Sequence, residues 1–276
     1  MKAVPVVTLL INSLLTSTHG FTVNHGGVKN NPIHLQMSST TTAETENPRL
    51  EGLALALDSG TRKSHSVAQN TAFVTGFFKG LSTKESYGAL LTSLYYVYTE
   101  MENAFEQTDA EVVRKLDSKE LRRVDSLKVD LNYFYGDDWN NKLKPTRATQ
   151  TYVDRVKEVA ENKPYLLVAH QYTRYLGDLF GGQMMGGMAT RSLSLDAGQG
   201  IAFYTFDDIP KANEFITEWY ALLNSLDLTE EQKEEIVDEA NLVFDLNIGI
   251  LEDLEGSAVG AFWALLKNTF KEKMGM

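Results

Sequence analysis

Residues 170–183 read HQYTRYLGDLFGGQ and place Gly177, Gly181 and Gly182 inside a stretch whose pattern otherwise predicts a helix. Apolar and aromatic residues recur on both sides of them at spacings of mostly three to five. Each interior glycine destabilises a helix by about 1 kcal/mol relative to alanine, so a plain core helix would avoid them. Glycines four residues apart leave one helical face bare. Two interpretations are open. In one, the glycines serve structure alone, through close helix packing or in a loop mistaken for a helix. In the other, the bare backbone lies against a flat ligand beside Asp178.

The composition of the 276 residues excludes several classes of site. The 26 basic and 37 acidic residues give a net charge of -11, and no basic run is present, so nucleic acid is not an expected partner. The chain has no cysteine, which excludes disulfides, thiolate zinc sites and iron–sulfur clusters. Any metal must therefore be bound by His, Asp or Glu, or arrive with a cofactor.

The N-terminal region has the layout of a targeting leader. A short apolar run over residues 4–15 predicts a secretory signal peptide at 1–20. Residues 21–48 are rich in Ser, Thr and Asn and lack acidic residues until Glu44, as in a transit peptide. Together they resemble the two-part leaders of plastids acquired by secondary endosymbiosis, which predicts the chloroplast stroma of an alga. An ordinary secreted protein is the alternative. The apolar runs are too short for an integral membrane segment in the mature protein.

Residues 49–276 predict a single all-α domain, because only three prolines and almost no alternating strand patterns follow residue 48. Capping boxes are expected at Ser82 with Glu85, Thr108 with Glu111 and Thr229 with Gln232, and Gly80 is a candidate helix stop. Helices are expected over residues 49–57, 60–79, 83–106, 109–135, 148–162, 164–191, 211–226, 230–254 and 257–271.

The predicted domain has two histidines, His65 and His170, which are the only candidates for an axial metal ligand. No Glu-x-x-His pair, phosphate-binding loop or nucleophile elbow occurs. A lone helical histidine is more often structural than a ligand. However, Gln69 lies one turn after His65 and could accept a hydrogen bond from its Nδ1–H, and Arg62 or Lys63 could neutralise the carboxylate of a bound cofactor.

Four segments in order carry a specific resemblance. They are the His65 helix continuing through FVTGFFKG (73–80), SLYYVY (93–98), YTRYLGDLFGGQ (172–183) and DEANLVFDLN (238–247). Over about residues 49–255 the chain resembles heme oxygenase, particularly the cyanobacterial and algal plastid type. The resemblance implies a multi-helix fold with heme between a proximal helix and a glycine-kinked distal helix.

The resemblance also implies the roles of individual residues. His65 takes the position of the iron ligand, the glycines leave room for dioxygen, Asp178 holds a water beside it, and His170 does not bind iron. The residues implied to act in catalysis are Asp178, Arg174, Thr173, Tyr98 and Asn247. Those implied to hold the heme are His65, Gly177, Gly181, Gly182, Arg62, Lys63, Gln69, Val74, Phe77, Tyr172 and Phe244.

The chain departs from the family pattern at several positions. Gln69 replaces the usual Glu, which predicts an iron that is easier to reduce. Phe180 replaces the usual Ser between the glycines, so its ring lies near the heme face or turns away from it. Asp58 stands where a lysine is common, and residues 219–223 carry no base. Arg62, Lys63 and Tyr172 would then be all that remains of the propionate clamp.

The implied reaction is the oxidative cleavage of heme b, as both substrate and cofactor, to biliverdin, ferrous iron and carbon monoxide. Reduced ferredoxin would supply the electrons, and biliverdin would feed bilin pigments, with a downstream bilin reductase as a further expected partner. Lys63, Lys79 and Lys84 could dock an acidic ferredoxin, although a solvated charged face is the commoner explanation of such a cluster. The alternative is a non-catalytic heme oxygenase-like protein that binds heme or serves as a scaffold.

Overall fold

The computed structural model describes residues 47–78 and 82–274, and within these ranges the regular structure is all helical. The predicted all-α class is therefore confirmed. The predicted signal peptide and nearly all of the predicted transit segment lie outside the described residues, as do Lys79 and Gly80. The chain from Thr45 onward forms one compact unit.

The chain around His65 is divided into short helices. η1 (Pro48–Leu50) precedes α2 (Gly52–Gly60), α3 (Arg62–Gln69) and α4 (Ala72–Phe78), so the prediction of one helix over 60–79 was wrong. The break falls at Asn70 and Thr71. The Asn70 side chain donates to the Ser66 carbonyl at 2.7 Å, and Thr71 Oγ1 accepts from the Val74 amide at 3.4 Å. Side chains that bond nearby backbone compete with helix continuation.

The next helix, α5 (Lys84–Gln107), begins one residue later than the predicted start at residue 83. Thr83 Oγ1 accepts from the Ser86 amide at 3.1 Å, and Ser86 Oγ accepts from the Thr83 amide at 3.0 Å. The reciprocal pair is thus Thr83 with Ser86 and not Ser82 with Glu85. The predicted box at Thr108 was also wrong, because the Thr108 amide ends α5 by donating to the Ala104 carbonyl.

The single helix predicted over 109–135 is divided into α6 (Glu111–Leu116), η2 (Lys119–Leu121) and α7 (Val124–Tyr135). Glu102 of α5 causes the second break, since its Oε1 accepts from the amides of Arg123 and Val124 at 2.6 and 3.1 Å. A carboxylate from another helix therefore caps α7, which local sequence cannot reveal. Two more helices follow, α8 (Trp139–Lys142) and α9 (Arg147–Asn162).

The glycine-bearing stretch is helical throughout, but it is not uniform. η3 (Pro164–Leu166) and α10 (Leu167–His170) lead into η4 (Gln171–Leu176), which is a π-helix, and then into α11 (Gly177–Ser192). A π-helix is wider than an α-helix and often marks a functional site. Here it ends at the residue before Gly177.

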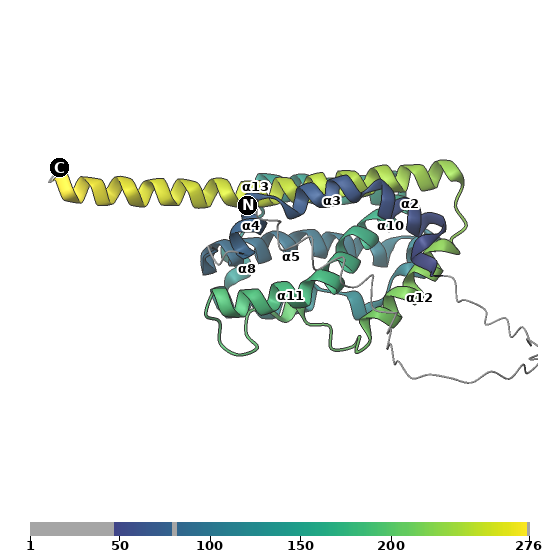
Figure 1. Ribbon diagram of the computed structural model, residues 1–276, viewed down its shortest axis with the longest axis horizontal. Helices are drawn as coiled ribbons and strands as arrows, with labels where there is room; N and C mark the ends of the chain where they lie inside the picture. Colours follow the sequence, from purple (N-terminus) through teal and green to yellow (C-terminus); the bar gives the residue numbers. More distant parts are fainter. Residues whose placement is uncertain (1–46, 79–81, 275–276) are drawn as a thin grey trace, which may run out of the picture. The chain divides into compact units, whose positions relative to one another are not determined.

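The last elements are η5 (Ala202–Tyr204), α12 (Ala212–Asn224) and α13 (Glu230–Met274). The Thr229–Gln232 capping box is confirmed by reciprocal bonds of 3.0 and 3.2 Å. The separate helices predicted over 230–254 and 257–271 are one continuous helix, because Gly256, the glycine between them, costs a helix only about 1 kcal/mol. Figure 1 shows α13 alongside α2 and α3, and these helices are in contact. No helix of the described ranges is long and apolar enough to cross a membrane.

Candidate functional site

The glycines of α11 face two different environments. A methyl group added at Gly177 or Gly181 would meet no neighbouring atom within 4 Å, so these positions border open space. A methyl group at Gly182 would lie 3.0 Å from Tyr204 Cδ1, and one at Gly186 would lie 3.2 Å from Tyr204 Cβ. Close packing therefore explains Gly182 and Gly186, whereas Gly177 and Gly181 leave a bare surface that faces open space.

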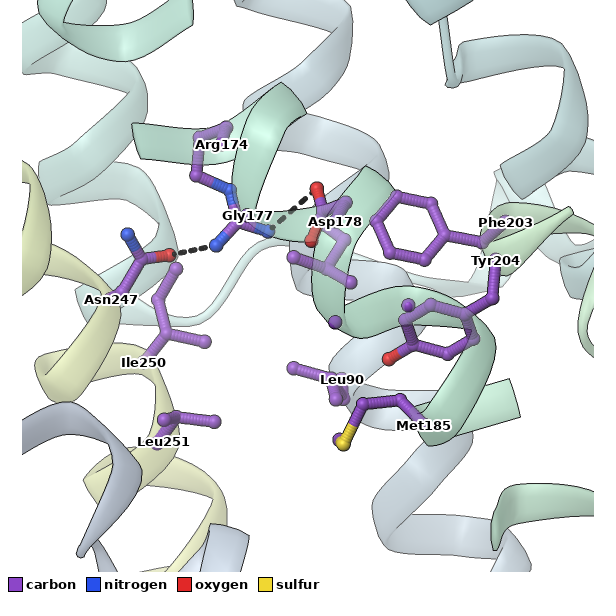
Figure 2. A pocket seen from close by; sticks show the side chains of 13 residues that line it. Leu90, Arg174, Gly177, Asp178, Met185, Phe203, Tyr204, Asn247, Ile250 and Leu251 are labelled. Atoms are coloured by element: carbon purple, nitrogen blue, oxygen red, sulfur yellow. Dashed lines mark hydrogen bonds and ion pairs between the residues drawn. The ribbon is translucent and has the colours of Figure 1, made fainter. Parts of the chain in front are cut away.

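The open space is a cavity of about 170 Å³ that α5, α11, η5 and α13 line together (Figure 2). One side is the bare backbone of α11, and the opposite sides are mostly apolar. The lining residues other than glycines are Leu90, Leu94, Arg174, Asp178, Met185, Phe203, Tyr204, Asn247, Ile250 and Leu251. Three of the predicted catalytic residues, Arg174, Asp178 and Asn247, are thus brought together at one cavity.

The polar edge of the cavity is a connected chain of hydrogen bonds and an ion pair. Tyr98 Oη donates to Asp178 Oδ2. Arg174 Nη2 lies 3.6 Å from the same Oδ2, and Arg174 Nη1 donates to Asn247 Oδ1 at 2.7 Å. Figure 2 shows Arg174 between Asp178 and Asn247. Asp178 and Arg174 are each only 14% exposed, so water screens their interaction weakly.

Burial sets the electrostatics of this edge. It raises the pKa of the Asp178 carboxyl, although Arg174 and the Tyr98 hydrogen bond partly oppose the increase. It also raises the pKa of Tyr98, so the Tyr98 hydroxyl keeps its proton and remains a donor. Burial alone would lower the pKa of Arg174, but Asp178, Tyr98 and Tyr152 together raise it, so the guanidinium is charged.

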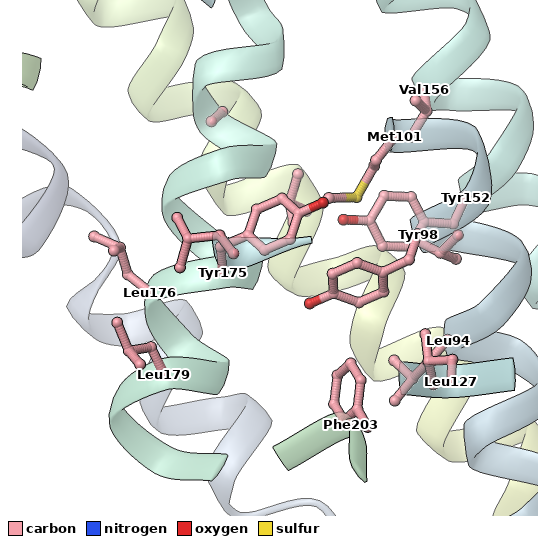
Figure 3. Packing of buried hydrophobic residues seen from close by; sticks show 14 of the residues in the cluster. Leu94, Tyr98, Met101, Leu127, Tyr152, Val156, Tyr175, Leu176, Leu179 and Phe203 are labelled. Atoms are coloured by element: carbon pink, nitrogen blue, oxygen red, sulfur yellow. The ribbon is translucent and has the colours of Figure 1, made fainter. Parts of the chain in front are cut away.

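The core holds Tyr98 in a fixed position (Figure 3). Its ring makes edge contacts with Tyr175 and Phe203 at centroid distances of 5.2 and 5.5 Å, and the side chain is completely buried. Aromatic pairs of this geometry stabilise a buried ring beyond its area of contact. The hydroxyl that holds Asp178 is therefore well positioned.

Asp130 of α7 fixes the wall opposite the glycines. Its carboxylate oxygens accept from the amides of Ala202 and Phe203, both at 2.8 Å, which places Phe203 and Tyr204 at the cavity. Burial raises the pKa of Asp130 to about 6, and the two backbone hydrogen bonds partly oppose this. No local pattern points to Tyr204, because it lies 22 residues from Gly182.

The π-helix changes which way its residues face. Thr173, a predicted catalytic residue, is buried, and its hydroxyl has no hydrogen-bond partner among the described residues. The same is true of Arg174 Nε. Arg174 lines the cavity, whereas Thr173 does not. An unsatisfied buried polar atom at a cavity marks a place where water or ligand can bind. Tyr172 points elsewhere and interacts with Thr61 at the end of α2.

His65 lies on α3, which Ser64 anchors to α13 by a 2.6 Å hydrogen bond to Asn241. The imidazole packs edge-on against Phe244 of α13 at 5.6 Å. It is exposed at the surface, but surrounding atoms still lower its pKa by desolvation, with a smaller opposing effect of Asp58. The side-chain nitrogen of Gln69, Nε2, lies 3.4 Å from His65 Nε2. The contact was expected at Nδ1, but the side chain one turn later lies over the Nε2 edge of the imidazole.

His65 is not among the residues that line the 170 Å³ cavity, but α13 contacts His65 and also lines the cavity. Phe244, against which His65 packs, lies one turn before Asn247 on α13, and Asn247 lines the cavity. The predicted pocket walls Val74, Phe77 and Phe244 do not line it either. Phe77 is completely buried and stacks on Tyr87 at 5.9 Å, because its side chain faces the core.

The predicted cations are exposed. Arg62 Nη2 lies 3.3 Å from Asp58 and its side chain is 75% exposed, and Lys63 is also exposed. The sequence did not single out Arg49, which bonds Asp58 more closely at 2.7 Å. Arg49 also lies over the Phe180 ring, at 5.8 Å from its centroid. Phe180 is 46% exposed and does not line the cavity, so its ring turns away from the cavity.

His170, the second histidine, belongs to a buried ionic cluster and not to the cavity. Its Nε2 lies 3.1 Å from Glu239 Oε1, and Arg155 bonds both oxygens of Glu239 at 3.1 and 2.5 Å. Burial would raise the pKa of Glu239, but His170 and Arg155 lower it to about 2. This cluster joins α9, α10 and α13, and a structural role explains it.

The chain is similar in sequence to a family of known proteins. The profile of the family described as heme oxygenase matches residues 51–253. The chain is 40% identical to a heme oxygenase of Guillardia theta over 215 residues, covering 78% of this chain and 91% of the relative. It is 39% identical to one of Porphyra purpurea over 224 residues, covering 81% and 95%.

Solved structures agree with these relatives. The crystal structure of heme oxygenase-1 from Synechocystis in complex with heme matches with a TM-score of 0.75 and 41% identity, covering 80% of this chain and all of that chain. That of heme oxygenase-2 from Synechocystis, in complex with heme and NO, matches with a TM-score of 0.74, covering 76% and 88%. The chain therefore belongs to the heme oxygenase family.

Proposed function

We propose that this enzyme cleaves heme to biliverdin, ferrous iron and carbon monoxide. The observation that carries the proposal is the bare backbone of Gly177 and Gly181 beside the buried carboxylate of Asp178. A planar ligand can lie directly against such a backbone, and Asp178 is close enough to act on what binds between them. The reaction follows the family, and this juxtaposition is what supports it in this chain.

The residues present fit a heme. The backbone at Gly177 and Gly181 borders open space, so a porphyrin ring could lie flat against it, and His65 offers a nitrogen ligand. The lowered pKa of His65 favours the neutral imidazole that metal binding requires. When bound, heme supplies an iron centre that activates dioxygen and a porphyrin that is itself the substrate.

The polar side chains at the cavity edge would control the delivery of protons to the bound ligand. The hydrogen bond from Tyr98 and the ion pair with Arg174 both involve Oδ2 of Asp178, so Oδ1 would hold a water in the cavity. Asn247 fixes the guanidinium of Arg174, and the unsatisfied Nε of Arg174 offers a further water site. The apolar walls, such as Leu90 and Ile250, limit the entry of other water.

The partner and location proposals rest on the leader and the relatives. Residues 1–48 would direct the helical domain to an algal plastid, where reduced ferredoxin would donate electrons and a bilin reductase would use the biliverdin. The algal relatives named above are consistent with this. Lys63 and Lys84 are exposed and would attract an acidic ferredoxin.

The test mixes hemin with the full chain and follows the Soret band. A ferredoxin reducing system is then added, and bilin and carbon monoxide are measured. We expect a shifted Soret band and both products. His65→Ala should lose the ligand signature and regain it with added imidazole. Hemin binding without bilin would favour the heme-binding or scaffold alternative and overturn the proposed reaction.

A further inference from the structure

The position of Arg49 is fixed by contacts from α12. Asn224 Nδ2 donates to the Pro48 carbonyl at 2.7 Å, and Asn224 Oδ1 accepts from the Ala54 amide at 2.9 Å. Asn47 also caps η1 by accepting from the Arg49 amide at 3.1 Å. The short N-terminal turn is therefore held against the helical unit, and the Arg49 side chain starts from a defined place.

The guanidinium of Arg49 bridges the two sides of the proposed heme site. On one side it bonds Asp58 of α2, the helix that leads directly into the His65 helix. On the other side it lies over the ring of Phe180, which stands between Gly177 and Gly181 on α11. A cation that touches both sides stands at the edge where a ligand between them would end.

Electrostatic interactions place Arg49 at the same edge. Burial would lower the pKa of Arg49, but the hydrogen bond to Asp58 and the nearby Tyr220 and Tyr172 raise it. Arg49 also acts electrostatically on His65. Its side chain is 45% exposed and that of Asp58 is 27% exposed, so a ligand from solvent can reach both.

Other bases are less suited to bind a ligand carboxylate here. Arg62 shares Asp58 but is 75% exposed, and residues 219–223 of α12 present no base. Arginine binds a carboxylate in a planar two-bond geometry that lysine cannot match, and an aromatic ring beneath it reduces its freedom. Phe180 is such a ring.

We propose that Arg49 binds a propionate carboxylate of the heme, which replaces Asp58 as its partner, and that Phe180 positions the guanidinium for this exchange. The inference rests on the proposed function, because it takes the porphyrin as the ligand. It assigns a ligand-positioning role to an N-terminal residue that precedes the His65 helix. Asp58 then serves as a stand-in anion in the free protein.

Affinities for hemin and for hemin dimethyl ester, whose propionates carry no charge, test the proposal. Arg49→Gln should weaken hemin binding roughly tenfold and leave the ester nearly unchanged. Arg49→Lys should recover part of the loss. Phe180→Leu should give a smaller loss, again only for hemin. Arg114→Gln, on the exposed surface of α6, is the matched control and should change neither affinity.

Asp58→Asn should have the opposite effect and tighten hemin binding, because it removes the competing anion. That gain should shrink when Arg49→Gln is combined with it. Thermal unfolding checks that each variant folds. Equal losses for hemin and its ester, or no loss in Arg49→Gln, would overturn this inference while leaving the reaction intact. Failure of the unaltered protein to bind hemin would overturn the proposed function and this inference together.

Discussion

Substituting Gly181 by alanine should stabilise the free protein and weaken its binding of heme. Alanine is favoured over glycine inside a helix by about 0.5–1 kcal/mol, and the new methyl group meets no atom within 4 Å. For a domain of this size that gain raises the Tm by about 1–4 °C. Few substitutions at a ligand site are expected to increase stability, so an increase in the free energy of unfolding would be informative by its sign alone.

The same methyl group would hold a planar ligand about 1.5 Å further from the backbone, the length of one carbon–carbon bond. A gap of about 0.5–1 Å already loses a quarter to a half of a dispersion contact. We therefore expect hemin affinity to fall by roughly tenfold or more in Gly181→Ala.

Two further glycines of α11 serve as controls. Gly187→Ala should stabilise the free protein similarly without affecting hemin, since its methyl group would make only an ordinary 3.9 Å contact with Arg191. Gly182→Ala should lose the stability gain, because the 3.0 Å approach to Tyr204 adds an overpacking cost of about 1–3 kcal/mol. Differential scanning calorimetry and Soret titration measure both effects. Hemin affinity in Gly181→Ala equal to that in Gly187→Ala would refute the assignment of the bare face.

Three other predictions concern the polar groups. Asp178→Asn should keep hemin binding but lower the bilin yield at least tenfold, measured as product per heme consumed; a normal yield would contradict its proton-handling role. Tyr98→Phe removes a hydrogen bond that lowers the pKa of Asp178, so the acidic limb of the pH profile for bilin formation should move to higher pH, and an unmoved limb would argue against their coupling. The folded-state pKa of Asp130, about 6, is above its unfolded value, so its contribution to stability falls as the pH rises from about 4 to 6. Asp130→Asn should flatten that part of the curve of unfolding free energy against pH, and an unchanged curve would count against the assignment.

The sequence predicted those features that depend on local pattern. The all-α class, the Thr229–Gln232 cap and the helix over 148–162 are local, and the structure confirms them within one residue. The helix predicted over 109–135 was wrong because Glu102 of another helix caps α7. That signal lies outside any local window.

In the site, too, local contacts could be predicted from the sequence and contacts between distant segments could not. The pairing of Asp178 with Arg174 could be expected, since the two are one turn apart on a helix. The contact between Gly182 and Tyr204, and that between Arg49 and Phe180, join segments far apart in the sequence. Composition and spacing carry no information on such contacts.

The π-helix over Gln171–Leu176 separates two α-helical segments, α10 before it and α11 with the glycines after it. A π turn accommodates one residue more than an α turn, which rotates everything after it by about 100° relative to a continuous α-helix. The positions before and after it therefore cannot be read on one helical wheel. The π turn takes up one extra residue, so deletion of one residue from this segment would restore α turns and leave the bare glycine face toward the cavity. A continuous α-helix through the unaltered sequence would instead turn that face away, so the orientation of the glycines depends on the local helix type as much as on residue identity.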